Sequence, residues 1–314
     1  MAEIITDETE YINLVKDVLK DGTIEIGRNG KTIEIFGRMM KFSLENGKFP
    51  LLTTKFVSWK TVLKELLWFI GGKTNNRFLN EQKVHIWDGN STREYLDSVG
   101  LTEYPEGILG PIYGFQWRNF NGEYDICNCY EKYKDTMMSS EALQCNCNNL
   151  EKEGRCDQLQ NIIDHLKDPN KRYSRRLIMS AWNPLQINQM ALPPCHVMCQ
   201  FRVTDGNKLS CLLTQRSGDI GLGVPYNIAS YAFLTHLIAF HCDLIPKDLV
   251  VSLGSAHIYD QHISGLTEQI SRDLYEQPLI GIKNKREKIE DYILDDFEII
   301  NYISHPSIKL EFVA

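Results

Sequence analysis

The chain has 314 residues, 43% of them hydrophobic and 24% charged, which is the composition of a globular protein with one substantial core, or at most two. Its formal net charge of -7 argues against general nucleic-acid binding, so an anionic substrate would need a local cluster of arginines. Segment 1–10 is acidic and lacks an apolar run, and no later stretch is long and apolar enough to span a bilayer, so we expect neither a signal peptide nor a membrane segment.

Apolar periodicity predicts the secondary structure of the first part of the chain. Residues 10–20 place their apolar side chains on one stripe of a helix, whereas residues 24–44 alternate like paired strands. Residues 59–70 have the spacing of a helix with one buried face, and Glu65 lies among mostly apolar neighbours on it. Such a carboxyl either reaches water at the boundary or is poorly solvated, with a raised pKa that suits proton transfer at neutral pH.

A hairpin is predicted in the second half of the chain. His196–Thr204 and Lys208–Ser217 alternate in the manner of strands, and residues 205–207 supply the turn between them. Pairing of the two strands would bring Cys195 beside Arg216. A guanidinium near a thiol favours the thiolate, which is the nucleophilic form. The alternative is that Cys195 is a small buried hydrophobe, as we expect for the other cysteines of these strands.

The remaining pattern completes an α+β protein. Residues 226–242 are apolar nearly all round, which predicts a helix inside the core, and Asn227 near its start suits an N-cap. His257 and Tyr259 are two residues apart and would lie on one face of a strand. Strands and helices mix without repeats or a long linker. We therefore expect one α+β domain over residues 1–314, with a large mixed sheet packed against helices.

Nine short motifs then stand out along the chain, at Glu65–Phe69, Ile86–Asp88, Leu109–Gly114, Arg175–Arg176, Ser180–Pro184, Pro193–His196, Gln215–Asp219, Gly221–Tyr231 and Ala256–Tyr259. In this order they resemble the motifs of the folate-dependent thymidylate synthases, from about Gly27 to the carboxyl terminus. The resemblance implies reductive methylation of dUMP to dTMP by 5,10-methylenetetrahydrofolate, which leaves as dihydrofolate. The folate supplies both the carbon and the reducing equivalent, so no flavin, nicotinamide or metal is implied.

The resemblance also implies how the reaction proceeds. Cys195 would add to carbon 6 of the uracil ring, and carbon 5 would then attack the one-carbon unit. Glu65 would manage protons at the base and the folate, and ordered water near Tyr113 would help to remove the carbon 5 proton. Asn227 would select uracil, because an amide offers an acceptor to the ring NH and a donor to the neighbouring carbonyl. The implied catalytic set is completed by His196, Arg216 and Asp219.

Binding residues follow from the same resemblance. The positions that match the nucleotide site are Arg28, Arg175, Arg176, Gln215, Arg216, Ser217, Asn227, His257 and Tyr259. The positions that match the folate site are Ile86, Trp87, Asn90, Asp219, Gly223, Tyr226 and Ala314, with the carboxyl-terminal tail expected to close as a lid. In the family, the pair at Arg175 and Arg176 serves the phosphate of the neighbouring subunit. We therefore expect a symmetric homodimer with shared arginines.

Some features leave alternatives open. Four positions depart from the family pattern and bear on folate affinity or lid closure, namely Ile108, Arg202, Tyr226 and Ser255. A deoxyuridylate hydroxymethylase, in which water instead of hydride meets the exocyclic carbon, is one alternative function. A non-catalytic nucleotide-binding interaction protein is another, although it would not need Cys195 and Glu65 together.

A segment at about 121–157 falls outside the resemblance and is rich in cysteine. Thiolates suit zinc, but Cys-x-Cys pairs are a weaker motif than Cys-x-x-Cys, so a surface loop with free thiols is favoured over a zinc site. The whole chain has nine cysteines, an odd number without secretory features, which predicts reduced thiols in the cytoplasm or, alternatively, the nucleus. The cysteines of the segment are Cys127, Cys129, Cys145, Cys147 and Cys156.

Overall fold

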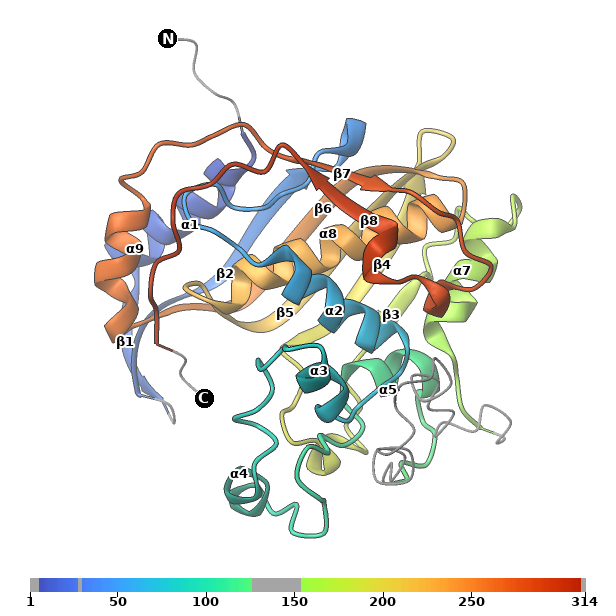
Figure 1. Cartoon of the computed structure of the whole chain (residues 1–314), viewed down its shortest axis with the longest axis horizontal. Helices are drawn as coiled ribbons and strands as arrows, with labels where there is room; N and C mark the ends of the chain where they lie inside the picture. Colours follow the sequence, from blue (N-terminus) through green and yellow to red (C-terminus); the bar gives the residue numbers. More distant parts are fainter. Residues whose placement is uncertain (1–5, 28–29, 126–153, 312–314) are drawn as a thin grey trace. The chain divides into compact units, whose positions relative to one another are not determined.

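The computed structural model describes residues 6–27, 30–125 and 154–311 (Figure 1). The chain forms two compact units, and their segments interleave along the sequence, so neither is a contiguous domain. The first unit comprises Met1–Leu63, His165–Leu177 and Cys195–Ala314. The second comprises Lys64–Asp164 and Ile178–Pro194.

A mixed sheet is the main feature of the first unit. Only β5 and β6 are parallel to each other, whereas the other pairs of neighbours among these five strands are antiparallel. This confirms the expected α+β class with a mixed sheet. In their order across the sheet, the five strands are β1 (Thr23–Gly27), β2 (Gly30–Ser43), β6 (Ile245–Tyr259), β5 (Lys208–Asp219) and β4 (His196–Thr204).

Helix α8 (Gly223–His241) connects the two parallel strands, since parallel neighbours cannot be joined by a tight turn. It packs against β5 and β6, and Figure 1 shows it lying across the sheet. Its side chains are apolar nearly all round, and both Leu234 and Ile238 have no exposed surface. Gly218 permits this close packing, because an added Cβ would lie 2.9 Å from Val224 Cγ2. The helix therefore fixes the strand ends that carry the candidate site.

Several predicted elements are confirmed. The predicted hairpin strands correspond to β4 and β5, and α2 occupies Trp59–Ile70 as the periodicity indicated. One prediction was wrong: Asn227 is not the N-cap of α8, because this helix begins at Gly223. Pro225 lies in the first turn, where the missing N–H has no helical partner to lose. Asn227 therefore projects from within the helix.

Further helices and strands complete the described parts of both units. The helices are α1 (Glu8–Asp21), α3 (Arg77–Glu81), α4 (Arg93–Ser98), α5 (Tyr113–Asn119), α7 (Gln158–Lys167) and α9 (Ile263–Gln269). The single-turn helices are η1 (Glu45–Gly47), η2 (Ile187–Gln189), η3 (Asp260–His262), η4 (Ile289–Asp291) and η5 (Leu294–Asp296). The second unit has the short strand β3 (Ile178–Ser180), and the first has a further antiparallel pair, β7 (Leu279–Ile282) and β8 (Phe297–Ile300). Across the part of the chain that the structure describes, no helix combines the length and apolar character needed to cross a membrane.

Candidate active site

The hairpin brings the predicted nucleophile and its arginine together. Cys195 directly precedes β4, and its carbonyl accepts a hydrogen bond from the backbone N–H of Arg216 at 3.0 Å. Burial raises the pKa of the Cys195 thiol, and the positive charge of Arg216 acts in the opposite direction. Arg216 thus favours the thiolate as predicted, but burial is the larger effect. The thiol is the favoured form in this structure.

A hydrogen-bonded network of amide side chains lies next to this pair. Gln215 is 1% exposed, and its Nε2 donates to Asn227 Oδ1 at 3.0 Å. The side chain of Asn227 also makes a hydrogen bond with His196, whose ring packs edge-on against Tyr231 with centroids 5.3 Å apart. Burial lowers the pKa of His196 to about 4, although the bond with Asn227 raises it. At neutral pH, a neutral imidazole and a glutamine thus orient the Asn227 amide from two sides.

The two parallel strands, β5 and β6, bring a carboxylate and a histidine together at the same end of the sheet. Asp219, the last residue of β5, lies opposite His257 of β6. The rings of His257 and Tyr259 have centroids 5.2 Å apart, in line with their predicted position on one face of the strand. Burial lowers the pKa of His257 even though Asp219 raises it, so this imidazole is also neutral at pH 7.

Three further predicted residues lie along the same segment. Ser217 of β5 is half-buried, and Gly223 and Tyr226 lie in the first turn of α8. A Cβ added at Gly223 would lie 3.7 Å from Asp219 Cβ and 3.8 Å from Asn227 Oδ1. Gly223 is therefore within contact distance of both side chains.

The arginine pair is held on the hairpin through its own backbone. Arg175 and Arg176 are exposed, and the carbonyl of Arg175 accepts a hydrogen bond from Gln200 Nε2 at 3.0 Å. The guanidinium of Arg202 donates to the carbonyl of Tyr173 in the same segment. Arg202, one of the departures from the family pattern, thus contacts the segment that presents the two arginines.

The second unit carries the candidate proton-transfer group. Trp87 Nε1 donates to Glu65 Oε1 at 2.7 Å. Burial raises the pKa of Glu65 to about 7, while the bond from Trp87 lowers it. The raised pKa supports the hypothesis of a poorly solvated carboxyl. Both protonation states are populated near neutral pH, which suits a group that takes up and returns a proton.

The other predicted residues of the second unit lie in the same neighbourhood. Tyr113 is 4% exposed and starts α5, and its ring centroid is 6.1 Å from that of Trp87. Asn90 is 5% exposed, and its backbone N–H donates to the carbonyl of Trp87 at 3.2 Å. Ile86 is half-buried and adjoins Trp87 in the chain. This loop thus combines apolar surface with a buried amide.

Some predicted residues lie outside the described part of the chain. They are Arg28, Ala314 and four cysteines of the cysteine-rich insert at about 121–157, namely Cys127, Cys129, Cys145 and Cys147. Cys156 is described and exposed, and Asn161 Nδ2 donates to its sulfur at 3.2 Å. No group of three or more His, Cys, Asp or Glu side chains that could hold a metal occurs within residues 6–27, 30–125 and 154–311. The zinc hypothesis for the insert therefore stays untested.

Two residues beside Asp219 were missed by the sequence analysis. Lys55 is 6% exposed and donates to the carbonyl of Gly221; burial lowers its pKa to about 8, while Asp219 raises it. His262 has no exposed surface, and its Nδ1 lies 3.6 Å from Asp219 Oδ1. Each is distant from Asp219 in sequence, so only the folded chain shows that they share its surroundings.

Comparison with known families agrees with this geometry. The sequence model of the family described as Thymidylate synthase matches residues 9–314, which is nearly the whole chain and includes segments of both units. The chain belongs to the thymidylate synthase family. This match begins at residue 9, whereas the resemblance of the sequence motifs begins at about Gly27.

Similar proteins are longer than this chain. It is 46% identical over 308 residues to the bifunctional dihydrofolate reductase-thymidylate synthase of Leishmania major, covering 97% of this chain and 55% of that protein. The putative bifunctional enzyme of Oryza sativa subsp. japonica is 44% identical over 306 residues, covering 97% and 57%. The bifunctional enzyme of Paramecium tetraurelia is 45% identical over 305 residues, covering 97% and 61%. The chain thus spans little more than half the length of these curated relatives.

Proposed function

We propose that this chain catalyses the reductive methylation of dUMP to dTMP, with 5,10-methylenetetrahydrofolate as the second substrate and dihydrofolate as the second product. Family membership supports the class of reaction. The observation that carries the assignment is the half-buried amide of Asn227, held by Gln215 next to Cys195 and Arg216, which are joined by a backbone hydrogen bond. In this proposal Cys195 is the nucleophile, Arg216 the cation beside it, and Asn227 the group that recognises the base.

Cys195 starts and ends the proposed reaction. Its thiolate adds to carbon 6 of the uracil ring, and the electron pair displaced from the double bond forms the bond from carbon 5 to the one-carbon unit, as one of that unit's two bonds to folate nitrogens breaks. Because burial raises the pKa of Cys195, the cation of Arg216 is needed to favour the thiolate as the substrate binds. The bond between sulfur and carbon 6 breaks in the last step, so Cys195 is regenerated.

Proton transfer is assigned to Glu65. The carbon 5 proton leaves, the folate amine is expelled as its bond to the exocyclic carbon breaks, and the folate then returns a hydride to that carbon. With a pKa of about 7, Glu65 can give a proton to the base or the departing nitrogen and take it back. Tyr113 is proposed to orient the water that accepts the carbon 5 proton.

Different residues are proposed to bind the base, the sugar and the phosphate of the nucleotide. The Asn227 amide is proposed to pair with the uracil edge, accepting from the ring NH and donating to the neighbouring carbonyl. His257 and Tyr259 are proposed to hold the sugar hydroxyl from one face of β6. Guanidinium forks match phosphate oxygens, and the groups proposed for the phosphate are Arg28, Arg175, Arg176, Arg216 and Ser217.

The folate-side residues fit a partly aromatic ligand. Trp87 is 7% exposed and lies beside half-buried Ile86, so the loop offers an apolar flank, while Asn90 offers hydrogen bonds. In the first unit, Asp219 provides a carboxylate acceptor next to Gly223. Tyr226 and Ala314 are proposed as further contacts, the latter from the closing tail.

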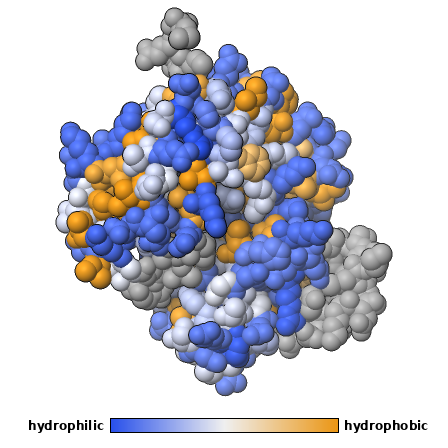
Figure 2. All heavy atoms as spheres, turned by 60° about the vertical axis from the view of Figure 1, so that its left-hand side comes forward, coloured by the Kyte–Doolittle hydropathy of each residue, from blue (hydrophilic) through white to orange (hydrophobic). Residues whose placement is uncertain are grey.

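The enzyme is proposed to act as a symmetric homodimer in the cytoplasm. Strands β1 and β2 carry large apolar side chains at the surface, with Ile26 85% and Phe36 82% exposed. Figure 2, which brings the β1 side of Figure 1 forward, shows apolar residues reaching the surface among hydrophilic ones. A second copy would cover such residues, and the exposed Arg175 and Arg176 would serve its phosphate site.

Product analysis tests the reaction. Incubation with dUMP and methylenetetrahydrofolate should yield dTMP and dihydrofolate in equal amounts, as measured by mass spectrometry. Formation of 5-hydroxymethyl-dUMP with tetrahydrofolate would instead identify the hydroxymethylase. Binding of dUMP without any product would favour the non-catalytic alternative.

Mixed dimers test the shared site. A Cys195→Ala chain and a chain with both Arg175→Ala and Arg176→Ala should each be nearly inactive. In a mixed dimer, one site collects every defect while the other keeps Cys195 and receives intact arginines. Co-refolding equal amounts should restore about a quarter of the wild-type activity, since half of the dimers are mixed and each has one intact site. Mixed dimers without activity would show that the arginines act within their own chain.

A further inference from the structure

His262 connects two parts of the first unit that are distant in sequence. It ends η3, directly before α9, and its side chain has no exposed surface. Nε2 lies 2.7 Å from the carbonyl oxygen of Glu311, near the carboxyl terminus, and Nδ1 lies 3.6 Å from Asp219 Oδ1. One buried ring thus contacts both the tail and the carboxylate that closes β5.

Both of these contacts are with acceptors. A backbone carbonyl only accepts, so Nε2 must carry the proton that it donates to Glu311. A neutral ring would then present the lone pair of Nδ1 to the carboxylate of Asp219, whereas an imidazolium donates toward both. Burial lowers the pKa of His262, but the contacts with Asp219 and the Glu311 carbonyl outweigh it, and the pKa lies above its ordinary value.

Other titratable groups also face this ring. Lys55 lies near Asp219 and opposes the positive form of His262. Tyr259 of β6 packs edge-on, with ring centroids 5.6 Å apart, and His257 on the same strand has a pKa that His262 helps to lower. The lowered pKa leaves His257 neutral, so Asp219 supplies the negative charge that the imidazolium meets.

The tail is seated on α9 next to His262. A Cβ added at Gly265 would lie 2.7 Å from Leu310 Cδ2 and 2.9 Å from Ile308 Cγ2. The tail therefore packs where the helix has no side chain, and Glu311 follows directly. Its position is fixed by this apolar contact and by the hydrogen bond from His262.

We propose that His262, as an imidazolium, is a positioning residue that ties the carboxyl-terminal segment 308–311 to Asp219 and orients both for the folate substrate. The tie itself is a property of the folded chain. Its consequence for the folate substrate rests on the proposed function. Because the protonated ring makes the tie, it should hold at low pH and loosen as the pH rises.

Hydrogen exchange of the tail tests the tie without any assay of activity. In the wild-type full chain, the protection of amides in segment 308–311, corrected for intrinsic exchange rates, should fall about tenfold from pH 6 to pH 9, because the bond from Nε2 to the Glu311 carbonyl loses its charge assistance and Nδ1 no longer donates toward Asp219. In His262→Gln, protection should be low and independent of pH. Wild-type protection that does not change with pH would overturn the proposal, and that measurement requires no substitution.

His305 offers a matched control. It lies in the same carboxyl-terminal region, its Nε2 contacts the Asp273 carbonyl at 3.0 Å, and its ring stacks on Tyr275 with centroids 4.7 Å apart. His305→Gln should leave the pH dependence of segment 308–311 as in the wild type. An equal effect of both substitutions would mean that His262 only supports the fold.

Kinetics then test the consequence for the substrate. The KM for methylenetetrahydrofolate should rise about tenfold over the same pH range in the wild type and should be high at every pH in His262→Gln, since the tail contact is worth about one charge-assisted bond. The KM for dUMP should change little. If no dTMP forms at all, the proposed function fails and the exchange result still decides the tie. If dTMP forms and the KM for folate is the same in both proteins, the positioning role is wrong.

Discussion

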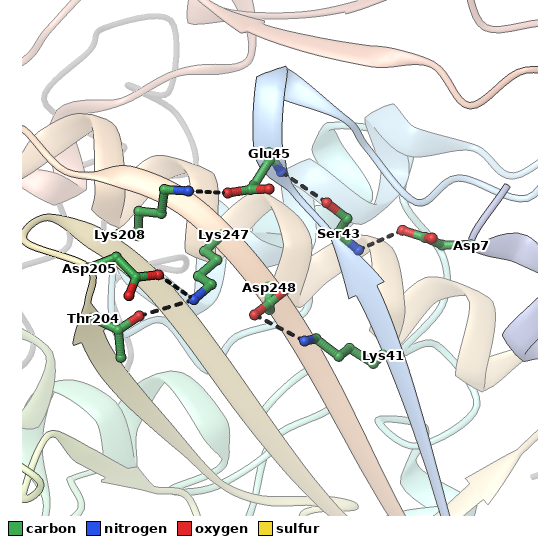
Figure 3. A network of polar contacts seen from close by, with 9 residues as sticks. All are labelled: Asp7, Lys41, Ser43, Glu45, Thr204, Asp205, Lys208, Lys247 and Asp248. Carbon is green, nitrogen blue, oxygen red and sulfur yellow. Dashed lines mark hydrogen bonds and ion pairs between the residues drawn. The ribbon is translucent and has the colours of Figure 1, made fainter. Parts of the chain in front are cut away.

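The two ends of the parallel strands β5 and β6 differ in whether the surroundings favour charged or neutral side chains. Where the strands start, Lys208 pairs with Glu45 at 2.5 Å and Lys247 with Asp205 at 2.7 Å (Figure 3). Hydrogen bonding to Lys208 lowers the pKa of Glu45, and Asp205 raises that of Lys247. These contacts favour the charged forms, and each charge finds its partner within the chain.

At the other end, burial dominates and favours neutral forms. It raises the pKa of Cys195 and lowers those of His196 and His257. Arg216 is exposed on the same strand that begins with Lys208. The difference teaches that the ion pairs at the first end stabilise the charges they join, whereas at the second end burial favours the neutral forms of Cys195, His196 and His257.

The largest expected effect is at the half-buried nucleophile, Cys195. Cys195→Ala should lower kcat/KM for dTMP formation by at least ~10³-fold, because a covalent catalyst is lost. Binding of dUMP, measured by calorimetry, should remain, since the arginines and Asn227 are intact. Residual turnover above about a thousandth of wild type would reject Cys195 as the nucleophile.

The second prediction concerns the carboxyl of Glu65, whose pKa is raised by burial. Glu65→Gln removes the transferable proton and should lower kcat/KM by roughly 10²-fold or more. Because burial raises the pKa of Glu65 from 4.5 to about 7, the folded state binds more protons than the unfolded state within this window. The free energy of unfolding of the wild type should therefore fall as the pH rises from 4.5 to about 7.

Denaturant unfolding of the wild type and Glu65→Gln at several pH values measures how much Glu65 contributes to the pH dependence of the free energy of unfolding. In Glu65→Gln, the same part of the pH dependence should be absent. Identical pH profiles for the two proteins would show that the Glu65 carboxyl is well solvated.

Sequence patterns predicted the elements well where the signal is local. The bounds of β4 match the predicted strand, and α2 runs from Trp59 to Ile70 as expected, because burial of one face imposes a strict periodicity. The start of α8 was missed because the first turn contains Pro225, which is tolerated there but resembles a break in the sequence.

The environment of the site depends on pairings that no local pattern encodes. The register that puts Asp219 opposite His257 pairs two strands that are joined through α8, so it is not a local feature of either strand. The contact of His262 with the tail joins residues 49 positions apart. The sign of the pKa shift at Cys195 likewise depends on how deeply the hairpin is buried, which the adjacent Arg216 alone does not reveal.

The third prediction concerns base selection. Asn227→Asp should weaken the preference for dUMP over dCMP by at least ~10²-fold, because the altered acceptor pattern leaves buried groups unpaired. The effect should be on selection, since Cys195 and Arg216 remain paired. Competition between the two nucleotides, followed by mass spectrometry, measures it. An unchanged preference would mean that the bond from Gln215 to Asn227 serves only the fold.

The smallest effect is expected where the charges are already satisfied. Lys208 and Glu45 are 35% and 41% exposed, so water screens their interaction and replaces it at little cost. Lys208→Ala should change the Tm by less than about 2 °C and leave kcat/KM within about twofold of wild type. Calorimetry and the dTMP assay measure these two quantities.

Arg216→Ala is the matched substitution at the opposite end of the same strand. It should lower kcat/KM by at least ~10²-fold, because the Cys195 thiol then stays desolvated without the cation that favours its thiolate. A comparable loss of activity in Lys208→Ala would show that the two ends of β5 are coupled through the strand. A difference of about 10²-fold between the two variants would instead place the function of β5 at the end where burial, and not ion pairing, sets the charge.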